Sequence, residues 1–425
     1  MKRFVGIALF ALVLTLSGCA SATIGGGDEG VSYLMADSGS GTTTGEVTTS
    51  DTTTDDDVVT TTTQTVTVAA GQLTAAEWID VEHYDFYLSL FAPDQDQSDG
   101  VFQSYQALGY FDTLNMVHVQ VTNGDAYVSG ALVELVNELG NTIVSTITNV
   151  FGQSYLFPGT DVVGEVTQIV VTKGEATITV DYVYDSENRD VQVDLVADTT
   201  ASEMLDIMFV IDTTGSMGDE ISYLKAEIAN VIAQVQEMLP NVTIRLALLF
   251  YRDDSDAYVT RYYDFSTNIS AQQLTLSLQN ASGGGDYPEA VDTALNVAMQ
   301  QAWSDASSTK LLFHVLDAPP HDDQESMTTF TNAIQTAAQQ GIRIIPVASS
   351  GVDKWTEYLL RCEAMMTGGT YVFLTNDSGI GGDHIEATVG EYTVEYLNSL
   401  LIRLIVKYQS GTELDIVPWR DDFQQ

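Results

Sequence analysis

Three polar side chains stand at alternate positions directly after an apolar run. In FVIDTTGSM (209–217), Asp212 ends the run, and Thr214 and Ser216 follow at intervals of two residues. On an extended loop such residues point to the same side, so their oxygens can converge on one point. One carboxylate and two hydroxyls are hard donors that suit Mg²⁺, Mn²⁺ or Ca²⁺ and suit zinc poorly. The structural alternative is that Thr214 or Ser216 caps the helix that follows.

Two later segments carry aspartates that could join this set. GGGDYPEAV (283–291) opens a helix; its glycines let the backbone approach a ligand, and Asp286 supplies a carboxylate. The apolar run in TKLLFHVLDAPPH (309–321) ends on Asp317. Clustered carboxylates repel one another unless a cation joins them, so these loops favour a metal site. The acidic loop YRDDSDAY (251–258) is either a second calcium site or a solvated loop near the binding face.

Alternating strands and helices over residues 201–410 must position these loops. LDIMFVID (205–212) is an apolar run of the kind found in buried parallel strands. The helix after it has one apolar stripe at spacings of three and four residues: Met217, Ile221, Leu224, Ile228, Val231, Val235 and Met238. The pattern of about six strands and six helices predicts an α/β, doubly wound, mainly parallel sheet. Ligands of such sheets lie at the carboxyl ends of the strands, where Asp212 and Asp317 are expected.

The motif DTTGSM (212–217) resembles the DxSxS motif of the von Willebrand factor A (vWA) family, with Thr214 in place of the first serine. The order of motif, second loop and strand-end aspartate is also similar, over roughly residues 204–410. The resemblance implies a metal-ion-dependent adhesion site, with these residues: Asp212, Thr214, Ser216, Asp286 and Asp317. Asp286 falls near the position where the family usually supplies a threonine. A carboxylate that binds the ion there would weaken the capture of a partner's acidic side chain, unless Asp286 acts through a water.

Motifs for hydrolytic chemistry are incomplete or absent from the sequence. A phosphatase of the haloacid dehalogenase type would need DxDxT, but Thr214 occupies the position of the second aspartate. A serine hydrolase elbow, GxSxG, would need glycine at the same position. HExxH and GxxxxGK[ST] do not occur. We therefore expect a binding protein and not an enzyme.

Three histidines and one cysteine near these loops have expected structural places. His314 lies within an apolar run and is expected in the core, whereas His321 is a candidate for the lining of the binding crevice. His384 precedes the last helix and is expected to cap or pack. Cys362 stands in the apolar pattern YLLRCEAMM and is expected to be a small buried side chain.

The charge balance restricts the partners of this protein. The 425 residues include 15 basic and 59 acidic side chains, which gives a formal net charge of −44. Such a surface repels nucleic acid and anionic lipid, so neither is an expected partner. The expected partner is an unidentified protein or glycan.

The first residues have the layout of an export signal. In MKRFVGIALFALVLTLSGCA, two basic residues precede an apolar stretch that is too short to span a bilayer. The end of this stretch resembles the bacterial lipoprotein signal box, which implies that residues 1–18 are removed and that Cys19 is lipidated. Ala20 in place of aspartate favours delivery to the outer membrane or surface. We therefore expect a lipid-anchored protein of the bacterial cell envelope, tethered to the membrane by its N-terminus.

Composition divides the rest of the chain. Residues 19–71 are rich in Gly, Ser, Thr and Asp and predict a flexible, extended stalk. Residues 72–112 are aromatic-rich and are expected to pack as a bridging segment onto a neighbouring domain, or to form an aromatic ligand site. Residues 113–200 alternate as short strands with turn signals and predict an antiparallel β-sandwich. This segment resembles carboxypeptidase-regulatory or transthyretin-like sandwiches, which implies a spacer, and residues 411–425 form a C-terminal tail.

These features predict a surface-exposed lipoprotein whose vWA-like domain binds a divalent metal. Metal-dependent binding of a protein or another ligand is the expected function. The alternative is a structural or assembly module of the cell envelope, in which the metal only stabilises the fold.

Overall fold

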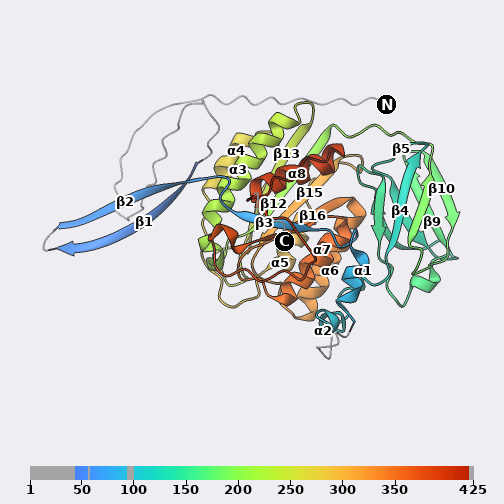
Figure 1. The fold of residues 1–425 in the computed structure, drawn as a ribbon, viewed down its shortest axis with the longest axis horizontal. Helices are drawn as coiled ribbons and strands as arrows, with labels where there is room; N and C mark the ends of the chain where they lie inside the picture. Colours follow the sequence, from blue (N-terminus) through green and yellow to red (C-terminus); the bar gives the residue numbers. More distant parts are fainter. Residues whose placement is uncertain (1–43, 56–57, 93–99, 421–425) are drawn as a thin grey trace, which may run out of the picture. The chain divides into compact units, whose positions relative to one another are not determined.

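The structure is a computed structural model that describes residues 44–55, 58–92 and 100–420 (Figure 1). The predicted signal peptide, the lipidation site at Cys19 and residues 421–425 of the predicted tail lie outside these ranges. Within the described ranges, no helix combines the length and the apolarity needed to cross a bilayer.

An eight-stranded sheet forms the centre of the α/β domain, and its strands are ordered β14-β13-β12-β15-β16-β17-β3-β18. The strands are β3 (Thr74–Trp78), β12 (Met204–Asp212), β13 (Thr243–Tyr251), β14 (Thr260–Ser266), β15 (Thr309–Leu316), β16 (Ile342–Ala348), β17 (Tyr371–Leu374) and β18 (Glu395–Tyr396). β12, β13, β15, β16 and β17 are parallel to one another. β14 pairs antiparallel with β13, and β3 pairs antiparallel with β17 and β18. The predicted mainly parallel sheet is confirmed.

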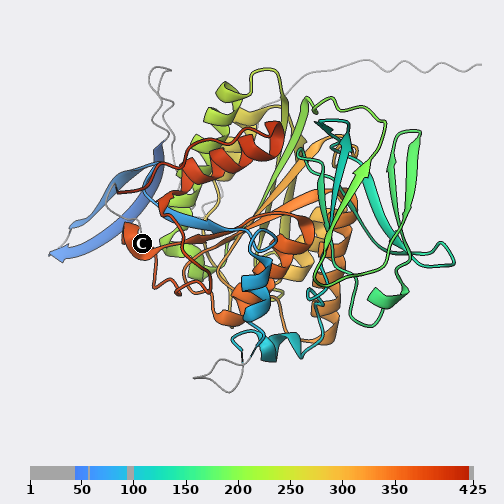
Figure 2. The same cartoon turned by 45° about the vertical axis from the view of Figure 1, so that its right-hand side comes forward.

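Helices cover both faces of this sheet (Figures 1 and 2). The helices are α3 (Ile221–Met238), α4 (Ile269–Ser277), α5 (Val291–Met299), α6 (Gln324–Gln340), α7 (Lys354–Thr367) and α8 (Leu397–Ser410). Side chains of β12 alternate between the faces: Phe209 joins the core beneath α3 and α8, and Val210 joins the core beneath α5, α6 and α7. The predicted stripe of α3 is buried except for Met238, which is 44% exposed at the last residue of the helix.

The predicted bridging segment is part of the α/β domain. β3 lies inside the sheet, between β17 and β18, and the short helices α1 (Tyr84–Ser89) and α2 (Gln103–Gln106) follow it. The carboxylate of Glu227 on α3 accepts hydrogen bonds from three consecutive backbone N–H groups, those of residues 71–73, at 2.8, 2.8 and 3.1 Å. The aromatic packing that the sequence predicted is present, since Phe91 and Phe102 lie against Tyr358 of α7. The run TAAEW gave no strand signal because it is short and contains two alanines.

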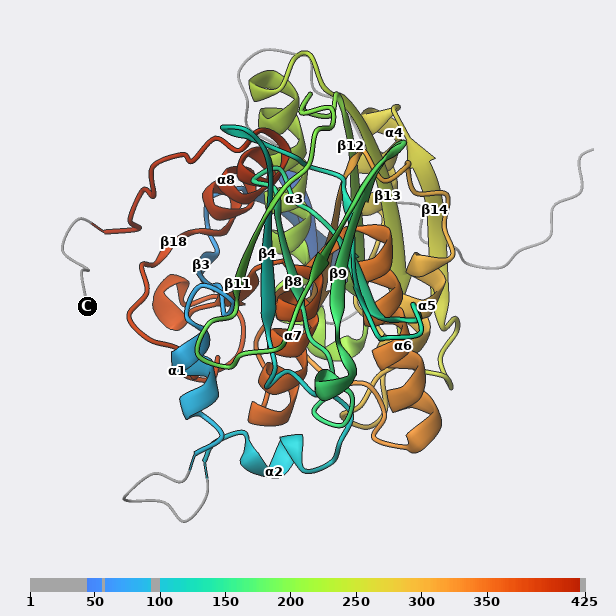
Figure 3. The same cartoon turned by 90° about the vertical axis from the view of Figure 1, so that its right-hand side faces the viewer.

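Residues 117–194 form two four-stranded sheets (Figure 3). Their strands are β4 (Val117–Asn123), β5 (Ala126–Tyr127), β6 (Leu132–Val136), β7 (Thr142–Ile147), β8 (Gln153–Leu156), β9 (Gln168–Lys173), β10 (Ala176–Asp181) and β11 (Asp190–Asp194). One buried cluster, which includes Val119 and Val133, draws residues from both sheets. One pairing departs from the expected antiparallel arrangement, because β11 runs parallel to β4. β7 contacts the α/β domain, where Arg343 donates to the carbonyl oxygen of Ile147 at 2.7 Å.

Part of the predicted stalk is paired. β1 (Thr44–Asp55) and β2 (Val58–Ala69) form an antiparallel hairpin, whereas residues 19–43 lie outside the described ranges. The sequence predicted a flexible, extended stalk because few apolar residues occur there. The many threonines and valines are β-branched, and β-branched side chains favour strands.

Candidate functional site

The first loop at the carboxyl edge of the sheet gathers the oxygens of the DTTGSM motif. Thr214 donates to Asp212 Oδ1 twice, from its backbone N–H at 2.8 Å and from its hydroxyl at 2.7 Å. The hydroxyls of Thr214 and Ser216 are 3.1 Å apart. Asp212 and Thr214 are fully buried, and Ser216 is exposed. The structure thus brings together three side chains that the sequence singled out.

The third loop places a second carboxylate beside the first. Asp317 follows β15 directly, and β15 pairs in parallel with β12, so that Asp317 lies at the same edge of the sheet as Asp212. Burial raises the pKa of Asp212, and the charge of Asp317 raises this pKa further. Burial also raises the pKa of Asp317, although hydrogen bonding by Ser216 opposes this rise. Two ionised carboxyls in this position repel each other, so the pair favours either a proton or a cation.

Backbone hydrogen bonds fix the second loop to the other two. Gly215 N–H donates to the carbonyl oxygen of Gly283 at 3.0 Å, which joins the second loop to the first. Glu289 N–H donates to the carbonyl oxygen of Pro319 at 3.0 Å, which joins the second loop to the third. Gly284 has a φ of +76°, and a Cβ atom there would lie 2.9 Å from Glu289 Oε1 and 3.3 Å from Thr214 Cβ. Glycine is therefore required where the second loop approaches the first.

The second loop turns Glu289, and not Asp286, toward the other carboxylates. Asp286 is exposed, and within the described residues no hydrogen bond or ion pair joins its side chain to Asp212 or Asp317. Glu289 is only 3% exposed, and burial together with the charges of neighbouring aspartates, Asp212 foremost, raises its pKa to about 9. Asp286 as a metal ligand stays a prediction, and Glu289 is the acidic side chain of the second loop that is buried beside Asp212. Both acidic residues occur in GGGDYPEAV, and only the path of the loop decides which one is buried.

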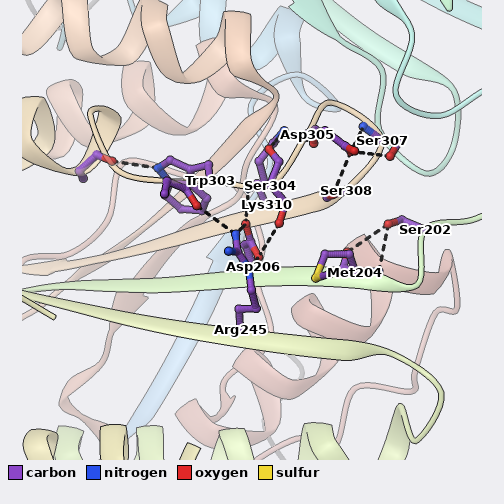
Figure 4. A network of polar contacts seen from close by, with 12 residues as sticks. Ser202, Met204, Asp206, Arg245, Trp303, Ser304, Asp305, Ser307, Ser308 and Lys310 are labelled. Atoms are coloured by element: carbon purple, nitrogen blue, oxygen red, sulfur yellow. Dashed lines mark hydrogen bonds and ion pairs between the residues drawn. The ribbon is translucent and has the colours of Figure 1, made fainter. Parts of the chain in front are cut away.

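Three oxygens of these carboxylates are buried and have no hydrogen-bond donor among the described residues. They are Asp212 Oδ2, Asp317 Oδ1 and Glu289 Oε2. Asp206, near the other end of β12, is a buried carboxylate whose hydrogen bonds can be compared with those of Asp212 (Figure 4). It is also fully buried, but it accepts bonds from Arg245 at 2.6 and 2.7 Å and from Ser304 at 2.7 and 3.1 Å. An orphaned carboxylate oxygen in the interior is costly, so the set around Asp212 fits a bound cation.

The carboxylates alone do not form a closed cage. Within the described ranges, no three His, Cys, Asp or Glu side chains converge closely enough to hold a metal by themselves. The candidate donors are therefore two carboxylates, Asp212 and Asp317, and two hydroxyls, Thr214 and Ser216, with Glu289 beside them. Hard oxygen donors of mixed charge suit Mg²⁺, Ca²⁺ or Mn²⁺.

A buried tyrosine beside the site was not singled out from the sequence. Tyr251 ends β13 and is paired in register with Asp212. Its hydroxyl is buried without a partner among the described residues, and burial, with the charges of Asp212 and Asp317, raises its pKa well above the ordinary value. A hydroxyl of this kind remains neutral and can donate a hydrogen bond toward an acidic centre.

The residues around the site have structural partners. His321 Nε2 lies 2.9 Å from Asp253 Oδ1, and His384 Nε2 lies 3.2 Å from Glu220 Oε1. Asp256, from the acidic loop 251–258, accepts a hydrogen bond from Gly284 N–H at 2.7 Å and so supports the second loop. The predicted core positions of His314 and Cys362 are confirmed, since both side chains are fully buried.

The family comparison agrees with this geometry. Residues 206–376 match the family model described as von Willebrand factor A domain. This range begins in β12 and ends just after β17, and it contains all three loops of the site. Residues 206–376 are thus similar to a vWA domain, and the parallel sheet of this segment carries the candidate site at its carboxyl edge.

Two curated proteins show partial similarity to this chain. An ariadne-like RING finger protein of Acanthamoeba polyphaga mimivirus is 29% identical over 133 residues, which are 31% of this chain and 13% of that protein. Alpha-protein kinase vwkA of Dictyostelium discoideum is 29% identical over 122 residues, which are 28% of this chain and 19% of that protein. The chain thus spans less than a fifth of the length of either relative.

Solved structures show a low overall similarity. The conserved hypothetical protein BatB from Bacteroides thetaiotaomicron is 13% identical, with a TM-score of 0.33 over 48% of this chain and 98% of that chain. The pilus adhesin SpaC from Lactobacillus rhamnosus GG is also 13% identical, with a TM-score of 0.33 over 48% of this chain and 30% of that chain. At this level the similarity adds nothing to the argument on function.

Proposed function

We propose that the vWA domain holds one divalent cation between its first and third loops, and that its carboxyl edge binds a protein or another ligand in a metal-dependent way. The observation that carries the proposal is a pair of buried oxygens, Asp212 Oδ2 and Asp317 Oδ1, that have no hydrogen-bond partner in the described part of the chain. Thr214 and Ser216 would complete the donor set. Mg²⁺, Ca²⁺ and Mn²⁺ all accept such oxygens.

Each residue at the site would have a separate role in holding the cation. The backbone N–H and the hydroxyl of Thr214 fix Asp212 Oδ1, which leaves Oδ2 for a cation. Ser216 is exposed and stands where the ion would meet solvent or a partner. Glu289 adds negative charge at the side of the second loop. When bound, the cation would offset part of the negative charge of these carboxylates and would accept a further oxygen ligand.

We further propose that the protein acts at the surface of a bacterial cell, anchored through a lipid on Cys19. The signal-like segment in residues 1–18 and the cysteine that follows it support this placement. We propose no catalytic activity. The relatives named for a RING finger and for a kinase share only 13% and 19% of their length with this chain.

A structural role for the metal is the second candidate function. It is supported by the burial of Asp212, Thr214 and Asp317, which leaves Ser216 as the exposed member of the set. In that case the ion would stabilise the three loops without touching a partner.

Two measurements test these proposals. Thermal unfolding of the protein is followed in EDTA, Mg²⁺, Ca²⁺ and Mn²⁺, for the wild type and for Asp212→Ala. We expect one or more of the ions to raise the Tm of the wild type only. Equal curves for the wild type in all conditions would refute the metal site. Pull-down of envelope proteins with and without EDTA then separates the two roles, because a purely structural ion predicts a capture that does not depend on EDTA.

A further inference from the structure

We propose that the carboxyl-edge face of the vWA domain selects basic polypeptide segments, so that lysine and arginine side chains of the partner make the contacts. The inference rests on the proposed function of this face and adds the chemistry of its partner.

Unpaired carboxylates surround the candidate site. Five exposed aspartates stand in the segments around the candidate site, four of them after strands of the sheet and Asp286 in the second loop, between α4 and α5: Asp219, Asp254, Asp286, Asp322 and Asp383. None of their carboxylates accepts a hydrogen bond or forms an ion pair with a residue of the described ranges. By contrast, Asp323 and Asp353, on the same edge, cap α6 and α7. The five aspartates are therefore free to meet external cations.

The positive side chains nearest this edge are already engaged. Arg252 donates to the carbonyl oxygen of Asn280 at 3.0 Å and lies over the ring of Tyr258. Lys354 forms an ion pair with Glu357 at 2.9 Å and donates to Thr388 at 2.6 Å. The loops 213–220, 278–290, 317–323 and 375–394 contain no lysine or arginine. Arg261, which is in register with Phe250 near the end of β13, is exposed and lies over the ring of Tyr258. Within the described residues, the loops that carry the candidate site therefore hold no lysine or arginine.

The centre of the face is acidic as well. Asp212, Asp317 and Glu289 each have a buried carboxylate oxygen without a hydrogen-bond donor among the described residues. The described part of the chain thus places no positive side chain on these oxygens, and this acidic centre disfavours a partner's carboxylate.

One aromatic ring on this face suits the same kind of partner. Tyr287, next to Asp286, is 42% exposed. Its hydroxyl donates to the carbonyl oxygen of Gly351 at 3.0 Å and accepts a bond from Asp353 N–H at 3.0 Å. The ring is therefore held in place at the residue that follows Asp286 in the second loop. Fixed aromatic rings beside carboxylates bind ammonium and guanidinium groups through cation–π contacts.

Peptide binding to the full chain tests the inference. The probe is a short peptide of alternating lysine and serine with one central glutamate, and the comparison peptide has glutamate in place of each lysine. Polygalacturonate represents acidic glycans. Affinities are measured in Ca²⁺ and in Mg²⁺, at about 0.05 M and about 0.5 M NaCl, since salt screens exposed charges. We expect the lysine peptide to bind, to weaken at high salt, and to be preferred over both acidic probes. A preference for either acidic probe would overturn the inference.

A matched pair of variants separates this face from the overall charge. The face variant combines Asp254→Asn, Asp286→Asn and Asp322→Asn. The control combines Asp125→Asn, Glu138→Gln and Glu175→Gln, which are exposed in turns of the β-sheet region and remove the same charge. We expect the face variant to bind the lysine peptide about tenfold more weakly and the control to stay within about twofold of the wild type. Equal losses in the two variants would show a non-specific charge effect and would refute the inference.

The outcome is independent of the metal test. If EDTA leaves the Tm unchanged but the face variant alone loses the lysine peptide, the metal proposal fails and the basic partner stands. If the metal stabilises the wild type but the acidic peptide binds best, the metal site stands and the basic partner is refuted. All six substitutions lie at exposed positions, and the Tm of each variant checks that it is folded.

Discussion

Asp206 and Asp212 share strand β12 and are both fully buried, but only Asp206 has hydrogen-bond donors from the protein at both carboxylate oxygens. Near its amino end the strand thus carries an aspartate that is paired with Arg245. At its carboxyl end it carries an aspartate with one oxygen that has no hydrogen-bond donor among the described residues. This contrast gives a direct comparison of two substitutions of the same kind.

Asp212→Asn and Asp206→Asn should affect stability in opposite ways. In EDTA, Asp212→Asn should leave the free energy of unfolding unchanged or raise it, because it removes a repelled, unpaired charge. Asp206→Asn should cost about 3 kcal/mol in EDTA and with metal, because it leaves Arg245 without its charge partner. Urea unfolding in EDTA and with saturating Mg²⁺ or Ca²⁺ measures both effects. If Asp212→Asn lowered the free energy of unfolding in EDTA as much as Asp206→Asn does, Asp212 would not be part of a cation site.

Glu289, and not Asp286, should influence the affinity for the metal. Glu289→Gln removes a charge that lies beside Asp212, so it should weaken the binding of Ca²⁺ about tenfold. Asp286→Asn is the matched control, and it should change the affinity by less than about twofold, because its carboxylate is exposed. Isothermal titration calorimetry gives both affinities. The reverse ranking would restore Asp286 as the residue of the second loop that acts on the metal.

The metal-free protein should lose stability as the pH rises. Burial, with neighbouring charges, raises the pKa of Glu289 from 4.5 to about 9 in the folded state. Between these values the folded state holds a proton that the unfolded state has released, so the free energy of unfolding falls with pH across this window. Glu289→Gln should reduce this fall by about 1 kcal/mol or more. Urea unfolding in EDTA from pH 5 to pH 9 measures how the free energy of unfolding changes with pH. An identical pH dependence in the variant would contradict the raised pKa of Glu289.

Gly284→Ala should disturb the second loop. The new methyl group would meet Glu289 Oε1 at 2.9 Å, and the φ of +76° is unfavourable for alanine, so a cost of about 1–2 kcal/mol is expected. Gly285→Ala is the control, because nothing lies within 4 Å of a Cβ atom there and its φ is not in the left-handed region. Thermal unfolding with and without Ca²⁺ shows both the cost and any loss of metal response. Equal effects of the two substitutions would exclude the close approach as the cause.

The sequence predicted the parts of the fold that have strong local patterns. The apolar run that ends on Asp212 identified the central strand, and the spacing from Ile221 to Val235 identified the buried face of α3. Asp212, Thr214 and Ser216 were predicted together because they are close in sequence. The burial of Glu289 depends on the close approach of Gly284 to Thr214 and on the bond from Glu289 N–H to Pro319, between residues that are distant in sequence. Local patterns carry no information on such contacts.

The place of β3 was not predictable for a similar reason. TAAEW is too short to distinguish a strand from a loop, and its partners in β17 and β18 lie about 300 residues away. The parallel pairing of β11 with β4 is likewise a property of the path between them, since the alternating pattern of a strand does not encode its direction.

The position of β3 determines which part of the molecule would bear a mechanical load. Along the chain from residue 71, the first element is β3, which is clamped by Glu227 and hydrogen-bonded on both sides within the central sheet. The sheets of residues 117–194 come afterwards, and the chain then returns to the same central sheet at β12. A pull on residue 71 against a ligand held at the carboxyl edge would therefore pass through β3 and its neighbours. Residues 117–194 lie between β3 and β12 in the sequence, so such a load would reach them only through their contacts with the α/β domain. Their role as a spacer stays a prediction.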